Sequence, residues 1–234
     1  MQEKVIGVLG GMGPEATVDF FAKVVSLTPA RKDQEHLRII IDNNPKIPDR
    51  TEAILSKNSK LIVPALTETA RNLERAGADF IAIPCNTAHY FYNDIARAVS
   101  IPVLHMIKEV GKSVQAILPG CQKIGLLGTS GTVSSGLYQI EMKGRGIEVI
   151  SPAPEYQARV MEAILMIKSG THKDKAEAAL KKIGNMLIEK YQAEGIILGC
   201  TDIPLVIGRD DFSVPVFDSN WVLAEATVKF ARSG

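Results

Sequence analysis

Two cysteines follow apolar segments at matching places in the two halves of this chain. Cys85 comes after residues 80–84, and Cys200 comes after residues 196–199. A thiol with a pKa near about 8.5 can act as a base once deprotonated and as an acid while protonated. Two thiols on opposite sides of a small-molecule site could therefore remove a proton from one face of a carbon atom and return one to the other face. That reaction is a racemisation or an epimerisation.

An internal repeat relates the two cysteines. Residues 6–13 align without gaps on residues 124–131, an offset of 118 residues, and the cysteines are offset by 115 residues. A glycine-rich turn followed by a strand that ends in cysteine therefore occurs twice, as two similar α/β lobes would produce. A single buried cysteine is more often a small hydrophobic residue, but the repeat favours a functional pair.

Two other residues of reactive type are assigned no catalytic role. Cys121 lies in a loop-like segment and has no repeat partner. His89 stands four residues after Cys85, and we interpret it as a packing or orienting residue rather than as a base.

Polar residues near the two cysteines could bind a substrate. Asn86 and Thr87 follow the first cysteine, and Thr201 follows the second. Their side chains and the N–H groups at helix starts could hold a carboxylate. Arg50, on a proline-interrupted loop, could bind a second carboxylate through two hydrogen bonds. On spacing alone, Lys168 at the end of a helix-like segment is better explained as a partner of the helix dipole.

The first glycine-rich turn could instead bind a dinucleotide, because residues 11–16 fit the pattern GxGxxA after a strand. The acidic residue that such a site needs about 20 positions further on is not in place, since Asp42 lies about 30 positions on. The turn also recurs at Gly128, and two turns fit the two sides of one cleft better than one nucleotide.

Short apolar runs alternate with segments of helical spacing, which predicts an α/β fold. Most of the strand-like runs are apolar throughout, as in parallel sheets covered on both faces. Strands are expected at residues 5–9, 37–41, 80–84, 103–104, 124–127, 148–150, 196–198 and 214–216. Helices are expected at residues 15–27, 62–76, 90–98, 136–145, 154–169, 173–194 and 219–232, with residues 51–60 and 169–175 as loops or helix starts.

The repeat also predicts how these elements divide. Residues 1–103 with 214–234 are expected to form a first lobe that carries Cys85, and residues 104–213 a second lobe that carries Cys200. Each lobe would have three layers around a parallel sheet, and a pseudo-twofold axis would relate the two. Ligands of parallel α/β sheets bind outside the carboxyl ends of the strands, so the active site is expected in the cleft between the lobes.

Composition narrows the class of protein. The 234 residues are 46% hydrophobic and carry a formal net charge of +1, which predicts a globular protein that binds neither nucleic acid nor membranes. No apolar run approaches the roughly 20 residues of a membrane span, and the first residues lead into a strand rather than a signal peptide. A cytoplasmic location is expected. Three widely spaced cysteines form neither a disulfide framework nor a metal-ligand pattern.

At these motifs the sequence resembles the pyridoxal-phosphate-independent aspartate/glutamate racemase family, in its aspartate racemase branch. The resemblance runs over essentially the whole chain. The segments that carry it are Gly10-Gly11-Met12-Gly13-Pro14, Pro84-Cys85-Asn86-Thr87-Ala88-His89, Gly128-Thr129 and Gly199-Cys200-Thr201. It implies two facing α/β lobes, a two-cysteine mechanism without a cofactor, and a homodimer.

The resemblance also implies roles for particular residues. Cys85 and Cys200 would flank the substrate Cα, one as thiolate base and the other as thiol acid, with the roles exchanged for the opposite enantiomer. Met12 would line the substrate site. The residues that would meet the α-carboxylate and the amino group are Asn86, Thr87, Thr129, Ser130 and Thr201. Arg50 and Lys168 would take the side-chain carboxylate, and no metal ligand is expected.

Two positions depart from the patterns of relatives. The glutamate racemases of cell-wall synthesis usually carry Asp-Ser in the first glycine-rich turn and His after the second Cys-Thr, where this chain has Gly10-Gly11 and Asp202. This difference argues against the cell-wall enzyme. Aspartate racemases usually have Glu at the position of Asp202, and a carboxylate close to Cys200 would disfavour the thiolate.

The sequence therefore predicts an isomerase of D-amino acid metabolism that acts on aspartate, and it leaves glutamate open as a further substrate. Other members of the superfamily stay open as alternatives: a maleate isomerase, a hydantoin racemase or a decarboxylase. Arg50 with Lys168 favours a dicarboxylate over a hydantoin. A catalytically silent dicarboxylate-binding protein is the alternative of a different class, and two intact cysteines weigh against it.

Overall fold

The computed structural model describes residues 3–233. Its contacts divide the chain into two units. The first contains residues up to 106 together with those from 220 onward, and the second contains Ile107–Ser219. The repeat placed the corresponding boundaries after residues 103 and 213, which are three and six residues earlier.

The first unit is built on a parallel sheet with the strand order β2-β1-β3. Its strands are β1 (Ile6–Gly10), β2 (Ile39–Asn43) and β3 (Phe80–Ala82), and Val103 adds a single parallel bridge to Ile81. Its helices are α1 (Pro14–Leu27), α2 (Arg50–Leu55), α3 (Ile62–Arg75) and α4 (Tyr92–Arg97), with short 3-10 turns η1 (Asp33–Glu35) and η2 (Thr87–Phe91).

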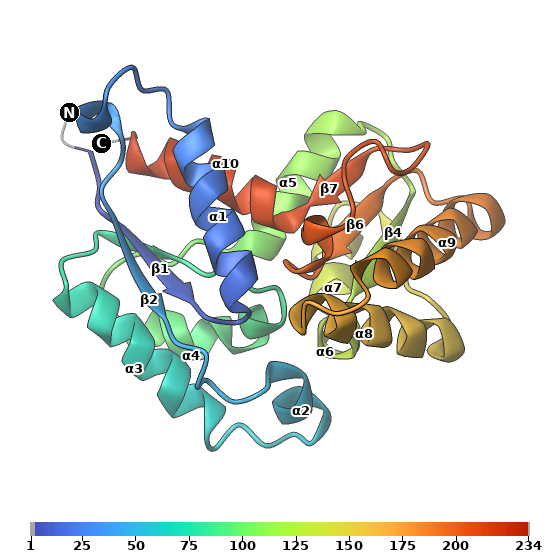
Figure 1. Cartoon of the computed structure of the whole chain (residues 1–234), viewed down its shortest axis with the longest axis horizontal. Helices are drawn as coiled ribbons and strands as arrows, with labels where there is room; N and C mark the ends of the chain where they lie inside the picture. The colour runs from blue at the N-terminus through green and yellow to red at the C-terminus, as the bar shows by residue number, and fades with distance from the viewer. Residues whose placement is uncertain (1–2, 234) are drawn as a thin grey trace. The chain divides into compact units, whose positions relative to one another are not determined.

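Helices cover both faces of this sheet (Figure 1). The helix α3 buries Ile62, Leu66 and Leu73, whose spacing places them on one side of a helix, in the same core as Leu9 and Ile81 of the sheet. On the opposite face, the ring of Phe80 lies 4.8 Å from that of Phe230 in an edge contact. Phe230 belongs to α10 (Ser219–Ala231), the last helix of the chain.

The second unit has a four-stranded parallel sheet with the order β5-β4-β6-β7. Its strands are β4 (Lys123–Gly128), β5 (Glu148–Ile150), β6 (Ile196–Gly199) and β7 (Val216–Asp218). Its helices are α5 (Met106–Ile117), α6 (Ser130–Ser135), α7 (Leu137–Lys143), α8 (Pro154–Lys168) and α9 (Lys173–Tyr191), with the 3-10 turn η3 (Ile203–Leu205).

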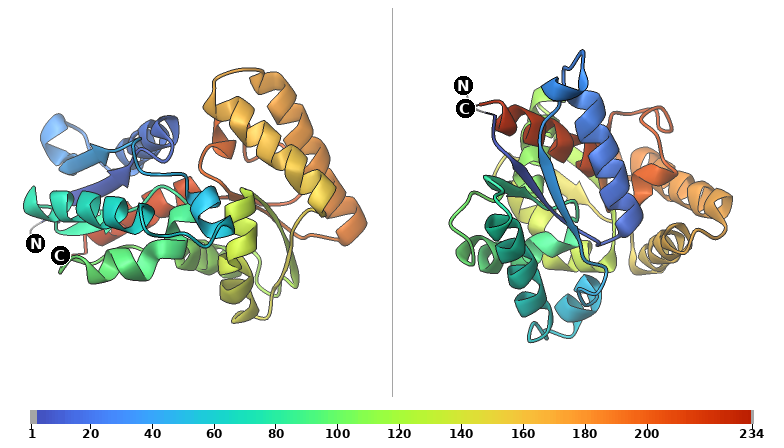
Figure 2. Two further views of the ribbon diagram at one scale, coloured as in Figure 1. Left: turned by 90° about the horizontal axis from the view of Figure 1, so that it is seen from below. Right: turned by 60° about the vertical axis from the view of Figure 1, so that its left-hand side comes forward.

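This sheet is also covered on both faces. The helices α8 and α9 lie side by side (Figures 1 and 2) and share a core with Leu127 and Leu198 of the sheet. On the other face, Tyr138 of α7 and Leu126 pack over Gly199, where a Cβ would lie 2.6 Å from Leu126 and 3.3 Å from Tyr138. Both units are therefore three-layer α/β structures with parallel sheets, as the sequence predicts.

The two sheets share one strand order, and the repeat explains it. The strands β2-β1-β3 and the bridge at Val103 correspond to β5-β4-β6 and β7. The helix that ends each repeat belongs to the other unit: α5 follows Val103 but lies almost wholly in the second unit, and α10 follows β7 but lies almost wholly in the first. The contact of Gln115 with Arg145, at 2.6 Å, and that of Asn220 with Asp19, at 2.7 Å, are part of this exchange.

The structure corrects several expectations. The last strand is β7 rather than residues 214–216, and it pairs with β6 in the second unit instead of belonging to the first lobe. The helices α5 and α6 were not expected, whereas α2 begins at Arg50 and agrees with the helix start allowed for residues 51–60. No helix among residues 3–233 is long and apolar enough to cross a membrane.

Candidate active site

Cys85 lies three residues after the end of β3, beyond the carboxyl edge of the first sheet, and is 5% exposed. Its carbonyl oxygen is 2.8 Å from Nδ1 of His89, and Nε2 of His89 accepts a hydrogen bond from the backbone N–H of Met106 at 3.0 Å. Because Nε2 accepts, the ring proton is on Nδ1, which donates to the carbonyl of Cys85. The histidine thus ties the backbone of the cysteine to the start of α5.

His89 is a neutral orienting residue in this structure. Burial, and secondarily the neighbouring His105, lower its pKa from 6.5 to about 4. Both ring nitrogens are engaged with the backbone, so His89 is not placed to take a substrate proton. The sequence interpretation of this residue is confirmed.

Asn86 and Thr87 continue from Cys85 into η2, and both are buried, at 1% and 5% exposure. The helix α2 packs against η2. This packing brings the element that begins with Arg50 to the segment that follows the cysteine.

The first glycine-rich turn has a shape that only glycine permits. Gly11 has a φ of +90°, and a Cβ there would lie 2.4 Å from the carbonyl carbon of Asn44. Its N–H donates to Oγ1 of Thr17 at 2.9 Å, and that hydroxyl donates to the carbonyl of Gly13 at 3.0 Å. Met12, within the turn, is 3% exposed and shares a core cluster with Cys85.

Arg50 is the first residue of α2, whose N-cap Asp49 accepts a hydrogen bond from the N–H of Glu52. Its Nη1 donates to the carbonyls of Ile47 and Pro48, at 3.2 and 3.1 Å. Its Nε is buried, with no hydrogen-bond partner within residues 3–233. A buried donor without a partner carries a free-energy cost that an incoming carboxylate would remove.

The second cysteine lies in a chain of three polar groups. The thiol of Cys200, 6% exposed, donates to Oδ2 of Asp202 at 3.6 Å, and the same oxygen lies 3.3 Å from Nζ of Lys168. Asp202 is buried and Lys168 is partly exposed. Lys168 therefore does more than end α8, because it brings a positive charge to the carboxylate beside the thiol. Thr201, which stands between Cys200 and Asp202 in the sequence, is 2% exposed.

Thr129 and Ser130 follow β4, next to Cys200, because Gly128 pairs in register with Gly199. Thr129 is the N-cap of α6, and its Oγ1 accepts from the N–H of Thr132 at 3.0 Å. The N–H of Ser130 lies 3.1 Å from the sulfur of Met161.

Three residues around Cys200 and the turn after β4 were not among the predicted site residues: Gln157, Met161 and Asp202. Gln157 donates through Nε2 to the carbonyl of Gly128 at 2.9 Å, and together with Met161 it holds the turn from α8. The burial of a polar Gln among the apolar positions of a helix was the available signal for Gln157. Asp202 was noticed in the sequence only as a departure from the patterns of relatives.

The predicted site residues thus fall into two groups. Met12, Arg50, Cys85, Asn86 and Thr87 lie in the first unit, and Thr129, Ser130, Lys168, Cys200 and Thr201 lie in the second. That the two groups line one cleft remains a prediction. Cys121 belongs to neither, since its thiol donates to the carbonyl of Lys123 at 3.5 Å, and burial and Glu194 raise its pKa. In the described part of the chain, no three His, Cys, Asp or Glu side chains are grouped to hold a metal ion.

Comparison with known proteins gives one consistent result. A family model described as Asp/Glu/Hydantoin racemase matches residues 9–227. The broad specificity amino-acid racemase RacX of Bacillus subtilis is 33% identical over 228 residues, which cover 96% of each chain. Among solved structures, the aspartate racemase of Picrophilus torridus is 33% identical with a TM-score of 0.86, covering 97% of this chain and 94% of its own. A putative Asp/Glu racemase from Yersinia pestis is 28% identical with a TM-score of 0.81, covering 97% and 99%.

Proposed function

This chain belongs to the Asp/Glu/Hydantoin racemase family, and from that premise we propose that it interconverts L- and D-aspartate, without a cofactor, by exchanging the Cα proton through two thiols. Membership of the family makes it an isomerase of the racemase type. The choice of aspartate and the two-thiol mechanism are the proposed part.

The observation that carries the proposal is the equivalence of Cys85 and Cys200. Each thiol is buried just beyond the same strand of the repeat: Cys85 lies three residues after the end of β3, and Cys200 follows β6 directly. No cysteine among the described residues is in a disulfide. A pair of thiols that stand in equivalent places suits a reaction in which each must perform the task of the other.

The proton balance follows from this pair. One cysteine, as thiolate, takes the proton from Cα and becomes a thiol, which leaves a carbanion next to the carboxylate. The other cysteine, as thiol, gives its proton to the opposite face of Cα and becomes a thiolate. The reverse reaction uses the same two groups with their roles exchanged, so no proton, electron or leaving group is left unaccounted for.

The contact between Cys200 and Asp202 supports a protonated resting thiol at Cys200. An ionised carboxylate can only accept a hydrogen bond, so a thiol that donates to it carries its proton. We therefore assign Cys200 as a thiol before substrate binds. The charge of Lys168 balances that of Asp202.

Two cations support an acidic substrate. In the first unit, the partnerless Nε of Arg50 is suited to bind a carboxylate. In the second unit, the Nζ of Lys168 supplies a positive charge near Cys200. Fixed cations and N–H dipoles would also stabilise the carbanion in a site from which water is excluded.

A second candidate function is racemisation of several amino acids. It is favoured by the similarity to the relative from Bacillus subtilis, whose name describes a broad specificity. The two candidate functions differ in which substrate side chains the site accepts. Aspartate selectivity requires Arg50 to bind a side-chain carboxylate, whereas broad specificity requires that neutral amino acids be turned over at comparable rates.

The experiment is incubation of the reduced protein, without added cofactor, with L-aspartate in D2O. We expect D-aspartate to form with deuterium at Cα, as detected by chiral chromatography and proton NMR. We also expect Cys85→Ser and Cys200→Ser each to abolish this exchange. Cys121→Ser is the matched control and should keep full activity. Near-full activity in either active-site variant would rule out the two-thiol mechanism. Turnover of maleate alone, or binding without exchange, would favour the isomerase or the silent binding protein.

A further inference from the structure

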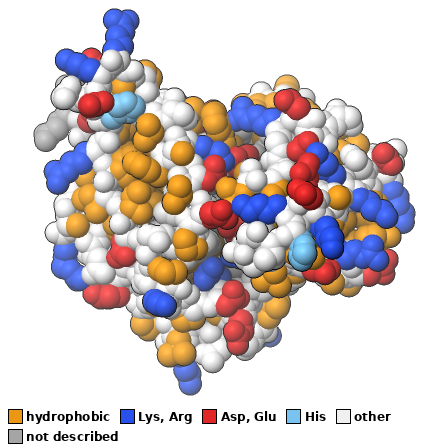
Figure 3. Space-filling view, viewed as in Figure 1, with side chains coloured by type: hydrophobic (Ala, Val, Ile, Leu, Met, Phe, Trp, Pro, Cys, Tyr) orange, Lys and Arg blue, Asp and Glu red, His pale blue; other side chains and the backbone are white. Residues whose placement is uncertain are grey.

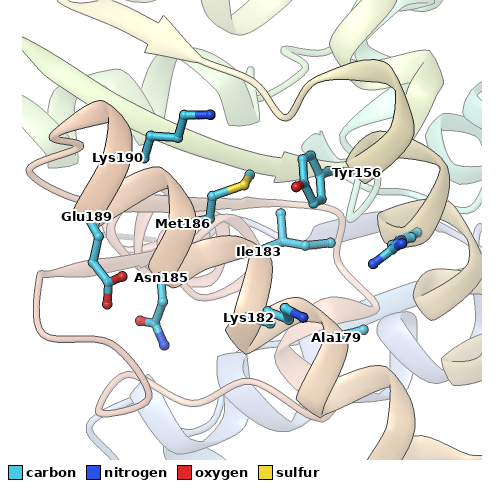
Figure 4. A pocket seen from close by; sticks show the side chains of 9 residues that line it. Tyr156, Ala179, Lys182, Ile183, Asn185, Met186, Glu189 and Lys190 are labelled. Atoms are coloured by element: carbon cyan, nitrogen blue, oxygen red, sulfur yellow. The ribbon is translucent and has the colours of Figure 1, made fainter.

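A groove of about 480 Å³ lies between α8 and α9, outside both groups of site residues. This volume is within the roughly 300 to 1,000 Å³ typical of small-molecule sites. Its apolar part consists of the ring of Tyr156 on α8 and of Ala179, Ile183 and Met186 on α9. Figure 4 shows Tyr156 across from Ile183 and Met186, so that the two helices supply opposite walls.

Charged residues at the groove are mostly positive. Arg159, Lys182 and Lys190 line it together with a single acid, Glu189. Within residues 3–233 none of these four takes part in an ion pair, whereas the neighbouring Lys181 pairs with both Glu177 and Asp211. The groove therefore carries positive charge that the protein itself does not neutralise.

This combination selects a kind of ligand. An apolar body would cover Tyr156 and Met186 and remove their surface from water. An acid group on that body would meet the three cations, of which Arg159 already lies over the ring of Tyr156 at 5.8 Å. A cationic ligand would be repelled, and a neutral ligand would leave the cations without a partner.

The helix α8 connects this groove with the second group of site residues. Tyr156 and Arg159 line the groove, while Gln157 and Met161 contact the turn at Gly128 and Ser130. The same helix ends at Lys168, which pairs with Asp202 beside Cys200. A ligand that shifts α8 relative to α9 would therefore change the surroundings of Cys200.

We propose that the groove between α8 and α9 binds a small organic anion with an apolar body, and that the bound anion alters the environment of Cys200 through α8. The coupling concerns the thiol of the proposed racemase site, but neither binding nor coupling requires that the protein racemise aspartate. Where the anion changes the affinity for substrate, linkage requires substrate to change the affinity of the groove by the same factor.

Binding is tested with 8-anilinonaphthalene-1-sulfonate, an aromatic body with one anionic group, followed by its fluorescence. We expect saturable binding at least tenfold tighter than that of N-phenyl-1-naphthylamine, which lacks the sulfonate. Ala179→Trp, which fills the groove, should abolish binding, and the exposed neighbour Ala178→Trp should leave it unchanged. Lys182→Glu should weaken binding at least tenfold, whereas Lys175→Glu, on the same helix outside the groove, should not.

Coupling is tested by the rate at which iodoacetamide alkylates Cys200, read by mass spectrometry. Saturating probe should change this rate at least twofold in the unmodified protein and leave it unchanged in Ala179→Trp. Equal binding in Ala178→Trp and Ala179→Trp, or equal affinity for the two probes, would overturn the assignment of the groove. An unchanged alkylation rate would overturn the coupling. Conversion of a dimer into a monomer by Ala179→Trp, without probe binding to the parent protein, would show that a second copy covers the groove.

Discussion

Arg50 offers a test of substrate choice at the scale of one residue. Replacement by lysine keeps the charge but removes Nε, the buried donor without a partner. A charge-assisted hydrogen bond of this kind contributes about 1.5 to 3 kcal/mol, so Arg50→Lys should lower kcat/KM for aspartate about 10- to 100-fold. Activity on alanine, if alanine is a substrate, should change little. Equal losses for both substrates would remove Arg50 from side-chain recognition.

The pair formed by Cys200 and Asp202 predicts a change in thiol reactivity. Asp202→Asn removes a negative charge beside the thiol and leaves the positive charge of Lys168 in place. Both effects favour the thiolate, so alkylation of Cys200 by iodoacetamide should become severalfold faster. Cys85, which lies in the other unit, serves as the internal control in the same digest. A slower reaction of Cys200 in the variant would contradict the resting protonation state assigned above.

His89 predicts how stability depends on pH. Its pKa is 6.5 when unfolded and about 4 when folded, so between these values the unfolded chain binds more protons. Its contribution is complete above pH 6.5 and is lost as the pH falls towards 4. The full effect is about 3 kcal/mol. Urea unfolding of His89→Asn, whose amide retains a donor, should lose correspondingly less stability between pH 7 and pH 4.5. His36→Asn, at an exposed position, should behave as the parent protein does.

At this scale the sequence predicted the residue types but not their partners. The cysteines and their polar neighbours were found because they stand at strand ends in a repeat. The contact of Lys168 with Asp202 could not be found from spacing, because 34 positions and a whole helix separate them. The orphaned Nε of Arg50 depends on where its Nη1 is bound, which only the fold determines.

Among the elements, the first glycine-rich turn yields a stability prediction with a matched control. Gly11 and Gly77 have φ angles of +90° and +91°, but a Cβ at Gly11 would strike the backbone of Asn44, whereas one at Gly77 would meet no atom within 4 Å. Gly77→Ala should cost about 1 to 2 kcal/mol from backbone strain alone. Gly11→Ala should lower the free energy of unfolding by at least about 2 kcal/mol more, because the backbone of the turn and that of Asn44 must move apart. Equal unfolding free energies in urea would show that Asn44 yields easily.

The elements that escaped prediction have physical reasons in common. The helix α5 contains Gly111, which lowers helix propensity, yet a Cβ there would lie 2.7 Å from Nε of Arg145. The helix α6 is rich in Ser, Thr and Gly, residues that favour turns, and it is fixed at its start by the cap at Thr129. In α5, packing against Arg145, and in α6, the cap at its start, outweigh the propensity of the residues within the helix.

For the whole molecule, a homodimer is our proposal, and α1 presents a surface that would serve it. Val18, Phe21 and Val25 are 67%, 42% and 38% exposed, one turn apart along the helix, and Figure 3 shows hydrophobic side chains gathered over α1. Such a stripe is uncommon on a monomer, and an uncharged face can meet its own copy without repulsion. Phe21→Glu should therefore yield monomers in sedimentation velocity, whereas Leu61→Glu, at another exposed site, should not. A dimeric Phe21→Glu variant would exclude this face.

The architecture of the units was largely predictable, because the repeat implied it. The glycine-rich turns and the cysteines recur at nearly one offset, and the shared strand order of the two sheets agrees with that offset. The allocation of β7 was not predictable, since a three-residue apolar run does not indicate which sheet it joins. Only its pairing with β6 decides this.

The exchange of α5 and α10 bears on how such a chain could have arisen. In a polypeptide that contained only one repeat, the last helix would not cover the sheet of that polypeptide. Two copies could then bury their sheets only by trading helices, as a swapped pair. Duplication and fusion of the gene would make that trade internal to one chain. The halves of the present protein, made as separate polypeptides, should accordingly fold together and not alone.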